Sequence, residues 1–143
     1  MKKYINLAFI YTILALVAGV FYREFTKFYN YDGATSLSVI HTHLLALGML
    51  FFLITAVFQH IVNIEEGFRY KVFMVAYNVG LVMTVLMLFL RGLTEVLEVS
   101  VSSGLDAGIS GFAGLGHMIF SIGLVFYFLN LFLIILVFFL QMF

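Results

Sequence analysis

Three histidines of this sequence lie in apolar stretches, where an ionisable side chain is costly and tends to serve a function. His41 and His43 are separated by one residue, and His117 lies in a later apolar stretch. Neutral imidazole is a ligand for haem iron, zinc and copper. The histidines therefore predict a cofactor or metal site, and the alternative is that they form hydrogen bonds between membrane helices.

The spacing of His41 and His43 indicates two ligand positions rather than one. Each residue of a helix turns by about 100°, so these two side chains point about 200° apart. Ligands of a single ion on one helix are instead three or four residues apart. The pair would then serve two sites on opposite faces of one helix. A fourth histidine, His60, is expected to be solvated at the membrane interface.

The surroundings of the histidines favour noncovalent haem b. The sequence has no cysteine, which excludes iron–sulfur clusters, thiolate zinc sites and covalently attached haem. The apolar run 44–52 could cover a porphyrin, and Arg91 could pair with a haem propionate or anchor the interface. Small residues near His117 would let a flat ring or another helix approach closely. These are Gly108, Gly111, Gly114, Gly116 and Gly123.

The scarcity of charge defines the elements that must position these residues. Of 143 residues, 64% are hydrophobic and 10% are charged, against about 25% charged in soluble domains, so a soluble protein is excluded. About 20 apolar residues cross a bilayer, and the uncharged stretches predict transmembrane helices near 4–22, 37–60, 71–93 and 109–140. The last is long, and must tilt, project from the bilayer or begin later.

The predicted fold is an all-α integral membrane protein, with one four-helix domain over residues 1–143 forming an antiparallel bundle or arc. The helices that carry the three histidines run in the same direction, which places His41, His43 and His117 at similar depth. Lysine and arginine counts favour a multi-pass protein of the cell membrane with both termini in the cytoplasm. Phenylalanines and tyrosines are expected to face lipid or to pack between helices. An acidic, solvated loop would contain Glu95, Glu98 and Asp106.

The segment from His41 to Met49, HTHLLALGM, resembles the H-x-H segment in a late helix of the catalytic subunit of haem–copper oxidases. In that family one histidine binds the high-spin haem and the other binds the low-spin haem. The chain also resembles a small family of bacterial four-helix membrane proteins that share the H-T-H-L-L and G-L-G-H segments. The residues that build the oxidase copper site are absent here, so the resemblance implies haem without copper.

The resemblance also implies an assembly, because the oxidase subunit consists of three arcs of four helices. Three copies of this chain would recreate that arrangement, with a haem between His41 of one protomer and His43 of the next. His117 has no counterpart, and would be an alternative ligand that pairs with either histidine inside one protomer. Small-residue pairs such as Ala107 with Gly111 also suit helix contacts. We expect a homo-oligomer, with a trimer favoured over a dimer.

The leading functional hypothesis is a haem b protein with bis-histidine ligation, for electron transfer or for redox or gas sensing. Two strong axial ligands leave no open position on the iron, which favours electron transfer with a redox partner or a quinone. One alternative is a haem-dependent oxidoreductase with an additional metal site. Another is a cofactor-free small transporter or assembly subunit. Whether the protein is an enzyme stays open, and the lack of a basic patch excludes nucleic acid.

Overall fold

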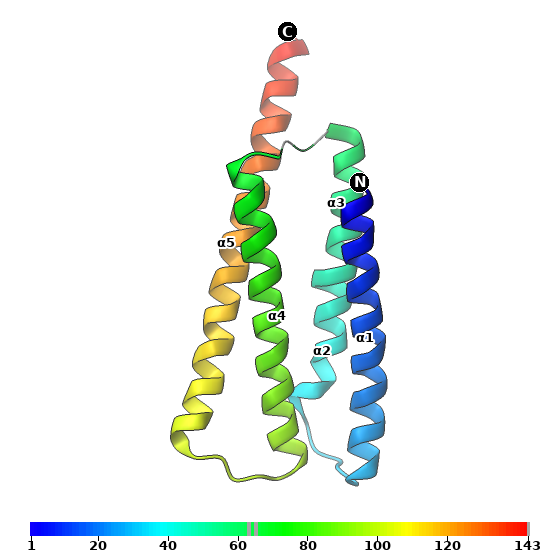
Figure 1. Cartoon of the computed structure of the whole chain (residues 1–143), viewed down its shortest axis with the longest axis vertical. Helices are drawn as coiled ribbons and strands as arrows, with labels where there is room; N and C mark the ends of the chain where they lie inside the picture. The colour runs from blue at the N-terminus through cyan, green and yellow to red at the C-terminus, as the bar shows by residue number, and fades with distance from the viewer. Residues whose placement is uncertain (63, 65, 143) are drawn as a thin grey trace.

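The computed structural model describes residues 1–62, 64 and 66–142. Within them, four helical segments are long and apolar enough to cross a membrane. They are α1 (Lys2–Phe28), the segment Ser36–Val62, α4 (Phe68–Val96) and α5 (Ser103–Met142). Consecutive segments run antiparallel, so both termini lie at the same end of the molecule (Figure 1). The all-helical fold with four spanning segments, predicted from the sequence, is confirmed.

The helices extend further than the sequence predicted. The predicted ranges 4–22, 37–60, 71–93 and 109–140 become 2–28, 36–62, 68–96 and 103–142. The first predicted range stopped before Arg23, but a helix satisfies its own backbone in water as well as in lipid and can continue past charged residues. Thus α1 continues through Arg23 and Lys27, and ends where Asn30 adopts a left-handed φ of 52°.

The last helix differs most from its predicted range. It was expected to tilt, to project or to begin later than residue 109, and the third alternative is wrong because α5 begins at Ser103. Its 40 residues extend about 60 Å at 1.5 Å per residue. Its C-terminal end projects beyond the other helices (Figure 1). A single helix therefore accounts for the described part of the last uncharged stretch, up to residue 142.

The segment Ser36–Val62, which we call the second spanning segment, is not a uniform α-helix. It begins with a 3₁₀ turn, η1 (Ser36–Val39), and continues as α2 (Ile40–His43), a π-helix (Leu44–Leu50) and α3 (Phe51–Val62). Gly48 in the π-helix leaves room for the Tyr11 ring of α1. The Tyr77 hydroxyl of α4 donates to the Leu47 carbonyl over 2.8 Å. The π-helix, which begins directly after His43, is thus in contact with both α1 and α4.

Aromatic rings fill the interior of the half of the molecule that carries the N-terminus. Phe52 is fully buried, and its ring stacks on Tyr11 with 5.8 Å between the centroids. The Phe51 ring lies 4.2 Å from that of Tyr77 in α4 and 5.0 Å from that of Tyr127 in α5. We call these rings, with others in contact with them, the aromatic core: Tyr4, Tyr11, Phe51, Phe52, Tyr70, Phe73, Tyr77 and Tyr127.

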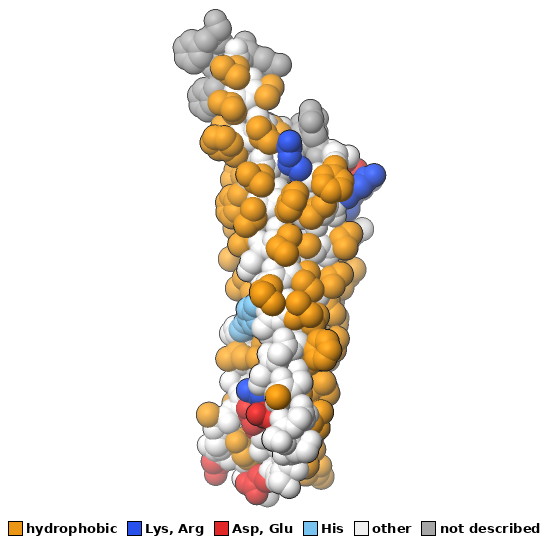
Figure 2. Space-filling view, turned by 90° about the vertical axis from the view of Figure 1, so that its left-hand side faces the viewer, with side chains coloured by type: hydrophobic (Ala, Val, Ile, Leu, Met, Phe, Trp, Pro, Cys, Tyr) orange, Lys and Arg blue, Asp and Glu red, His pale blue; other side chains and the backbone are white. Residues whose placement is uncertain are grey.

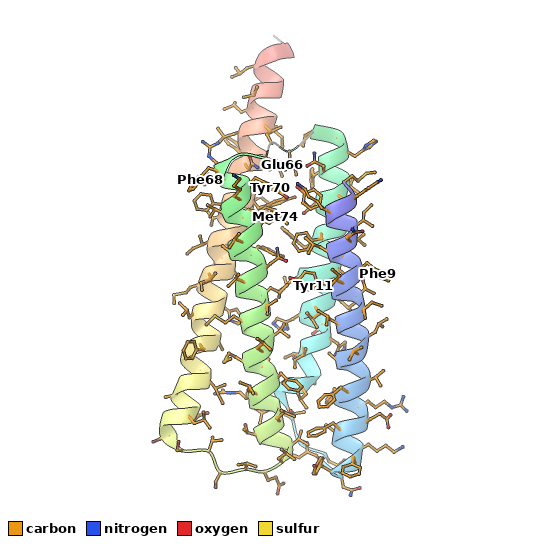
Figure 3. The ribbon with its side chains drawn as sticks, in the orientation of Figure 1. Phe9, Tyr11, Glu66, Phe68, Tyr70 and Met74 are labelled. Atoms are coloured by element: carbon orange, nitrogen blue, oxygen red, sulfur yellow. The ribbon has the colours of Figure 1, made fainter. Side chains whose placement is uncertain are left out.

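Both expected uses of aromatic residues occur. The rings of the aromatic core pack between helices, and Tyr11 and Tyr70 point toward neighbouring helices (Figure 3). Phe9 is 65% exposed and points away from the other helices (Figure 3).

The contact between α4 and α5 depends on glycine rather than on aromatic rings. A Cβ atom added at Gly80 would overlap the backbone of Phe120, and one at Gly123 would overlap the backbone of Tyr77.

Candidate functional site

The candidate histidines do not form one cluster. His41 and His43 lie together in α2, whose regular α-helical turn directs them to different faces. His117 lies in α5 with its side chain exposed. No three His, Asp or Glu side chains gather closely enough to hold a metal ion in the described part of the chain. The histidines can therefore act only singly or in pairs within one chain.

His43 and His117 share the same local hydrogen bond. The Nδ1 of His43 lies 2.8 Å from the Val39 carbonyl, and that of His117 lies 2.9 Å from the Ala113 carbonyl. A carbonyl can only accept, so Nδ1–H is the donor in both cases. The lone pair of each neutral ring is then on Nε2, which is the arrangement of a metal-ligating histidine whose other nitrogen donates to a backbone carbonyl.

His41 is in a different environment. It faces α1, where a Cβ atom added at Gly19 would lie 3.7 Å from the His41 Cβ. Its Nδ1 is buried and has no hydrogen-bond partner. A metal ion cannot reach that enclosed nitrogen, and ligation through Nε2 would leave a buried Nδ1–H without an acceptor. Of the three candidate histidines, His41 is the least suited to act as a metal ligand.

Arg91, the candidate propionate partner, already has partners inside the chain. Its guanidinium donates to an Asp106 carboxylate oxygen over 3.0 Å and to the Ser110 hydroxyl over 2.6 Å. These bonds join the end of α4 to the first turns of α5. The side chain remains 36% exposed, so a further carboxylate could approach it.

The acidic loop expected around residue 98 is only partly a loop. Glu95 belongs to the last turn of α4 and accepts from the backbone N–H and the hydroxyl of Ser36, over 2.6 Å and 3.0 Å. Asp106 lies in the first turns of α5 and pairs with Arg91. Asp106 is exposed, as expected of a solvated carboxylate, although it also pairs with Arg91. Glu95 is only partly exposed, because it caps the start of the second spanning segment. Sequence spacing could not reveal contacts between groups as distant in the chain as Ser36 and Glu95.

The glycines near His117 divide into two sets. Gly116 and Gly123 face α4, and a Cβ atom at either would press on Thr84 or Tyr77. The other set is Gly108, Gly111 and Gly114, where an added Cβ atom would meet nothing within 4 Å. The face of the molecule on the α5 side carries a histidine side chain among hydrophobic ones, and below it lie backbone, uncoloured side chains and charged groups (Figure 2). This face is open to a flat ring or to another helix.

A cavity that the sequence did not indicate lies between α1 and α4. It has a volume of about 410 Å³. The Tyr11 hydroxyl donates to Asn78 over 2.6 Å near one end, and the Phe21 and Phe89 rings lie 5.4 Å apart near the other. The remaining walls are apolar side chains of α1, α4 and the start of the second spanning segment. No histidine lines the cavity, so it is separate from the candidate site.

His60 lies near the end of α3, at the end of the second spanning segment away from His41, and is exposed.

The four apolar helices define an α-helical protein of multi-pass membrane type. The chain belongs to the family described as protein of unknown function (DUF2871), whose model matches residues 1–134. No curated protein matches the chain. No solved structure matches it either.

Proposed function

We propose that the protein binds haem b noncovalently through two histidines in the membrane, and that it carries electrons or senses redox state or a diatomic gas. The observation that carries this proposal is the shared hydrogen bond of His43 and His117, which leaves Nε2 of each ring as a free acceptor. The donor set therefore fits haem iron, for which imidazole is a common axial ligand. Bound haem would supply one-electron chemistry.

The residues around the histidines suit a large flat apolar cofactor. The open glycines of α5 present backbone without side chains beside His117. The exposed part of Arg91 could receive a propionate, in exchange with or beside Asp106. Two histidine ligands would leave the iron without an open position, so electron transfer to a redox partner or a quinone is favoured over ligand chemistry.

The alternatives receive less support. Histidines acting as links between helices should bond across a helix contact, but the hydrogen bonds of His43 and His117 both stay within their own helix. An oxidoreductase with an additional metal site needs further ligands beside a histidine. No third His, Asp or Glu joins them among the described residues.

The proposal includes an assembly and a location. The part of the open face of α5 that points away from His117, at Gly108 and Gly111, would be covered by a second copy of the chain, in a homotrimer in preference to a dimer. The protein would lie in the cytoplasmic membrane with both termini on the cytoplasmic side, because Lys2, Lys3, Arg69 and Lys71 lie at the end that carries the termini.

A haem titration tests the proposed function. Protein produced without haem is titrated with ferric haem b and followed by absorbance, beside the triple variant H41A/H43A/H117A. We expect saturable binding and a low-spin spectrum for the wild type, and neither for the variant. Equal, unsaturated uptake by both proteins would contradict the proposal.

A further inference from the structure

The register of the helices places His43 and His117 at one level, on two segments that flank α4. Along α4, Gly92 packs against Leu37, and Tyr77 bonds to the Leu47 carbonyl. Thr84 lies about midway between Gly92 and Tyr77, as His43 lies about midway between Leu37 and Leu47. His43 and Thr84 are therefore at the same depth.

Thr84 of α4 also indicates the depth of His117. Gly116 packs directly against Thr84, so the next residue, His117, is at this depth as well. His117 shares a helix face with Phe120 and Leu124, three and seven residues later. Phe120 contacts Tyr77, and Leu124 packs on the buried core. The face that carries His117 thus turns toward the interior further along α5.

His43 also lies above residues that turn toward α4 and α5. Phe51, two turns further along the second spanning segment, contacts the rings of Tyr77 and Tyr127. Leu47, between them, packs on the buried core. His41 instead faces α1. The two members of the H-x-H segment therefore belong to different sides of α2, and only His43 is on the side that turns toward α4 and α5.

Thr84 has a buried hydroxyl at this level, in the contact between α4 and α5. Thr12, Thr55 and Ser121 each donate to the carbonyl four residues earlier in their helices. The Thr84 hydroxyl is buried, with the residue 3% exposed, and it has no hydrogen-bond partner. Gly116 of α5 packs directly against this hydroxyl, so the contact between α4 and α5 encloses it. The buried hydroxyl therefore marks a depth at which α4 and α5 are in direct contact.

Arg91 extends the same face toward the membrane surface. It lies seven residues after Thr84, which is two helical turns or about 10 Å along α4. Its guanidinium also turns toward α5, where it bonds to Asp106. A cofactor bound at the level of Thr84 would therefore have a partly exposed cation on one side, in the direction of the surface.

We infer that His43 and His117 of the same chain are the residues that would hold the haem iron, and that His41 positions α2 against α1 without binding iron. This inference rests on the proposed haem function and makes it specific. It differs from a haem shared between protomers through His41 and His43. The site needs one chain only, so each chain would hold one haem.

Single histidine variants test the assignment. H41A, H43A and H117A are titrated with haem b, and the reduced proteins are exposed to carbon monoxide. We expect H41A to keep the six-coordinate spectrum and to stay unreactive toward carbon monoxide. H43A and H117A should bind haem at least about tenfold more weakly and react with carbon monoxide, because each loses one ligand. Added imidazole should restore their six-coordinate spectra.

Loss of the six-coordinate spectrum in H41A, or its retention in H117A, would overturn the assignment while leaving the haem function intact. If the wild type binds no haem, the proposed function itself fails. Helix content by circular dichroism identifies any variant that does not fold. The imidazole rescue then distinguishes loss of a ligand from loss of structure.

Co-expression of H43A with H117A distinguishes a haem site within one chain from a site shared by two chains. In a mixed oligomer, a site shared between chains would regain both histidines at some interfaces. A site within one chain would regain none. We expect no six-coordinate haem in the mixed preparation, and its recovery would contradict the inference.

Discussion

In the half of the molecule that carries the N-terminus, rings from all four spanning segments interlock, and Tyr4, Phe52 and Tyr77 are fully buried. In the opposite half, around His41, His43 and His117, glycines line an open face. Buried polar atoms without a partner occur in both halves, at Tyr127 in the first and at His41 and Thr84 in the second. One half therefore supplies the packing that orders the helices, and the other keeps the open surface that a ligand could use.

The largest expected effect comes from breaking the aromatic core. Phe52→Ala removes a fully buried ring in contact with five others, and should cost about 3 kcal/mol or more of unfolding free energy. Phe9→Ala, at a 65% exposed position, is the matched control and should change it by less than about 0.5 kcal/mol. Denaturant unfolding in detergent measures both. Similar losses would show that the core does not carry stability.

A second change compares two kinds of glycine. Gly80→Ala places a Cβ atom against the Phe120 backbone, and should cost about 1–3 kcal/mol because the helices must separate. Gly108→Ala adds the same atom where nothing lies within 4 Å. It should leave the unfolding free energy of the isolated chain unchanged or slightly raised. A destabilising Gly108→Ala in monomeric protein would contradict this division of the glycines.

A smaller effect is expected at the boundary between the halves. Tyr11→Phe removes the 2.6 Å hydrogen bond to Asn78 that links α1 to α4. Bonds of this kind in membranes contribute about 0.6 kcal/mol on average. A double-mutant cycle with Asn78→Leu should give a coupling energy of that size. No measurable coupling would mean that apolar packing alone closes this end of the cavity.

The smallest effect concerns the end of the molecule that carries the termini. Lys3 hydrogen-bonds to Glu66 and, with its charge, lowers the pKa of that carboxyl. A lowered folded-state pKa stabilises the fold at neutral pH, and this contribution is lost as the pH falls through the carboxyl's range. In a pH series of melting temperatures, Glu66→Gln should remove this acid-dependent component. An unchanged pH profile would show that the pair contributes nothing.

The number and order of the helices could be predicted from the charge-free stretches, because a bilayer requires about 20 apolar residues per crossing. The helix ends could not, because charged residues such as Arg23 and Lys27 continue a helix in water. The 200° divergence of His41 and His43 follows from helix geometry alone. Which of them faces α5 depends on Gly19, Thr84 and the π-helix, and none of these contacts has a signal in sequence spacing.

The central claim is that the half around the histidines holds one haem per chain between two histidines. The most direct measurement is the oxidised and reduced absorption spectrum of wild-type protein purified from haem-replete cells, with iron counted per chain. We expect one haem per chain, a six-coordinate spectrum in both states, and no change on adding carbon monoxide. A stable, folded and colourless protein would contradict it.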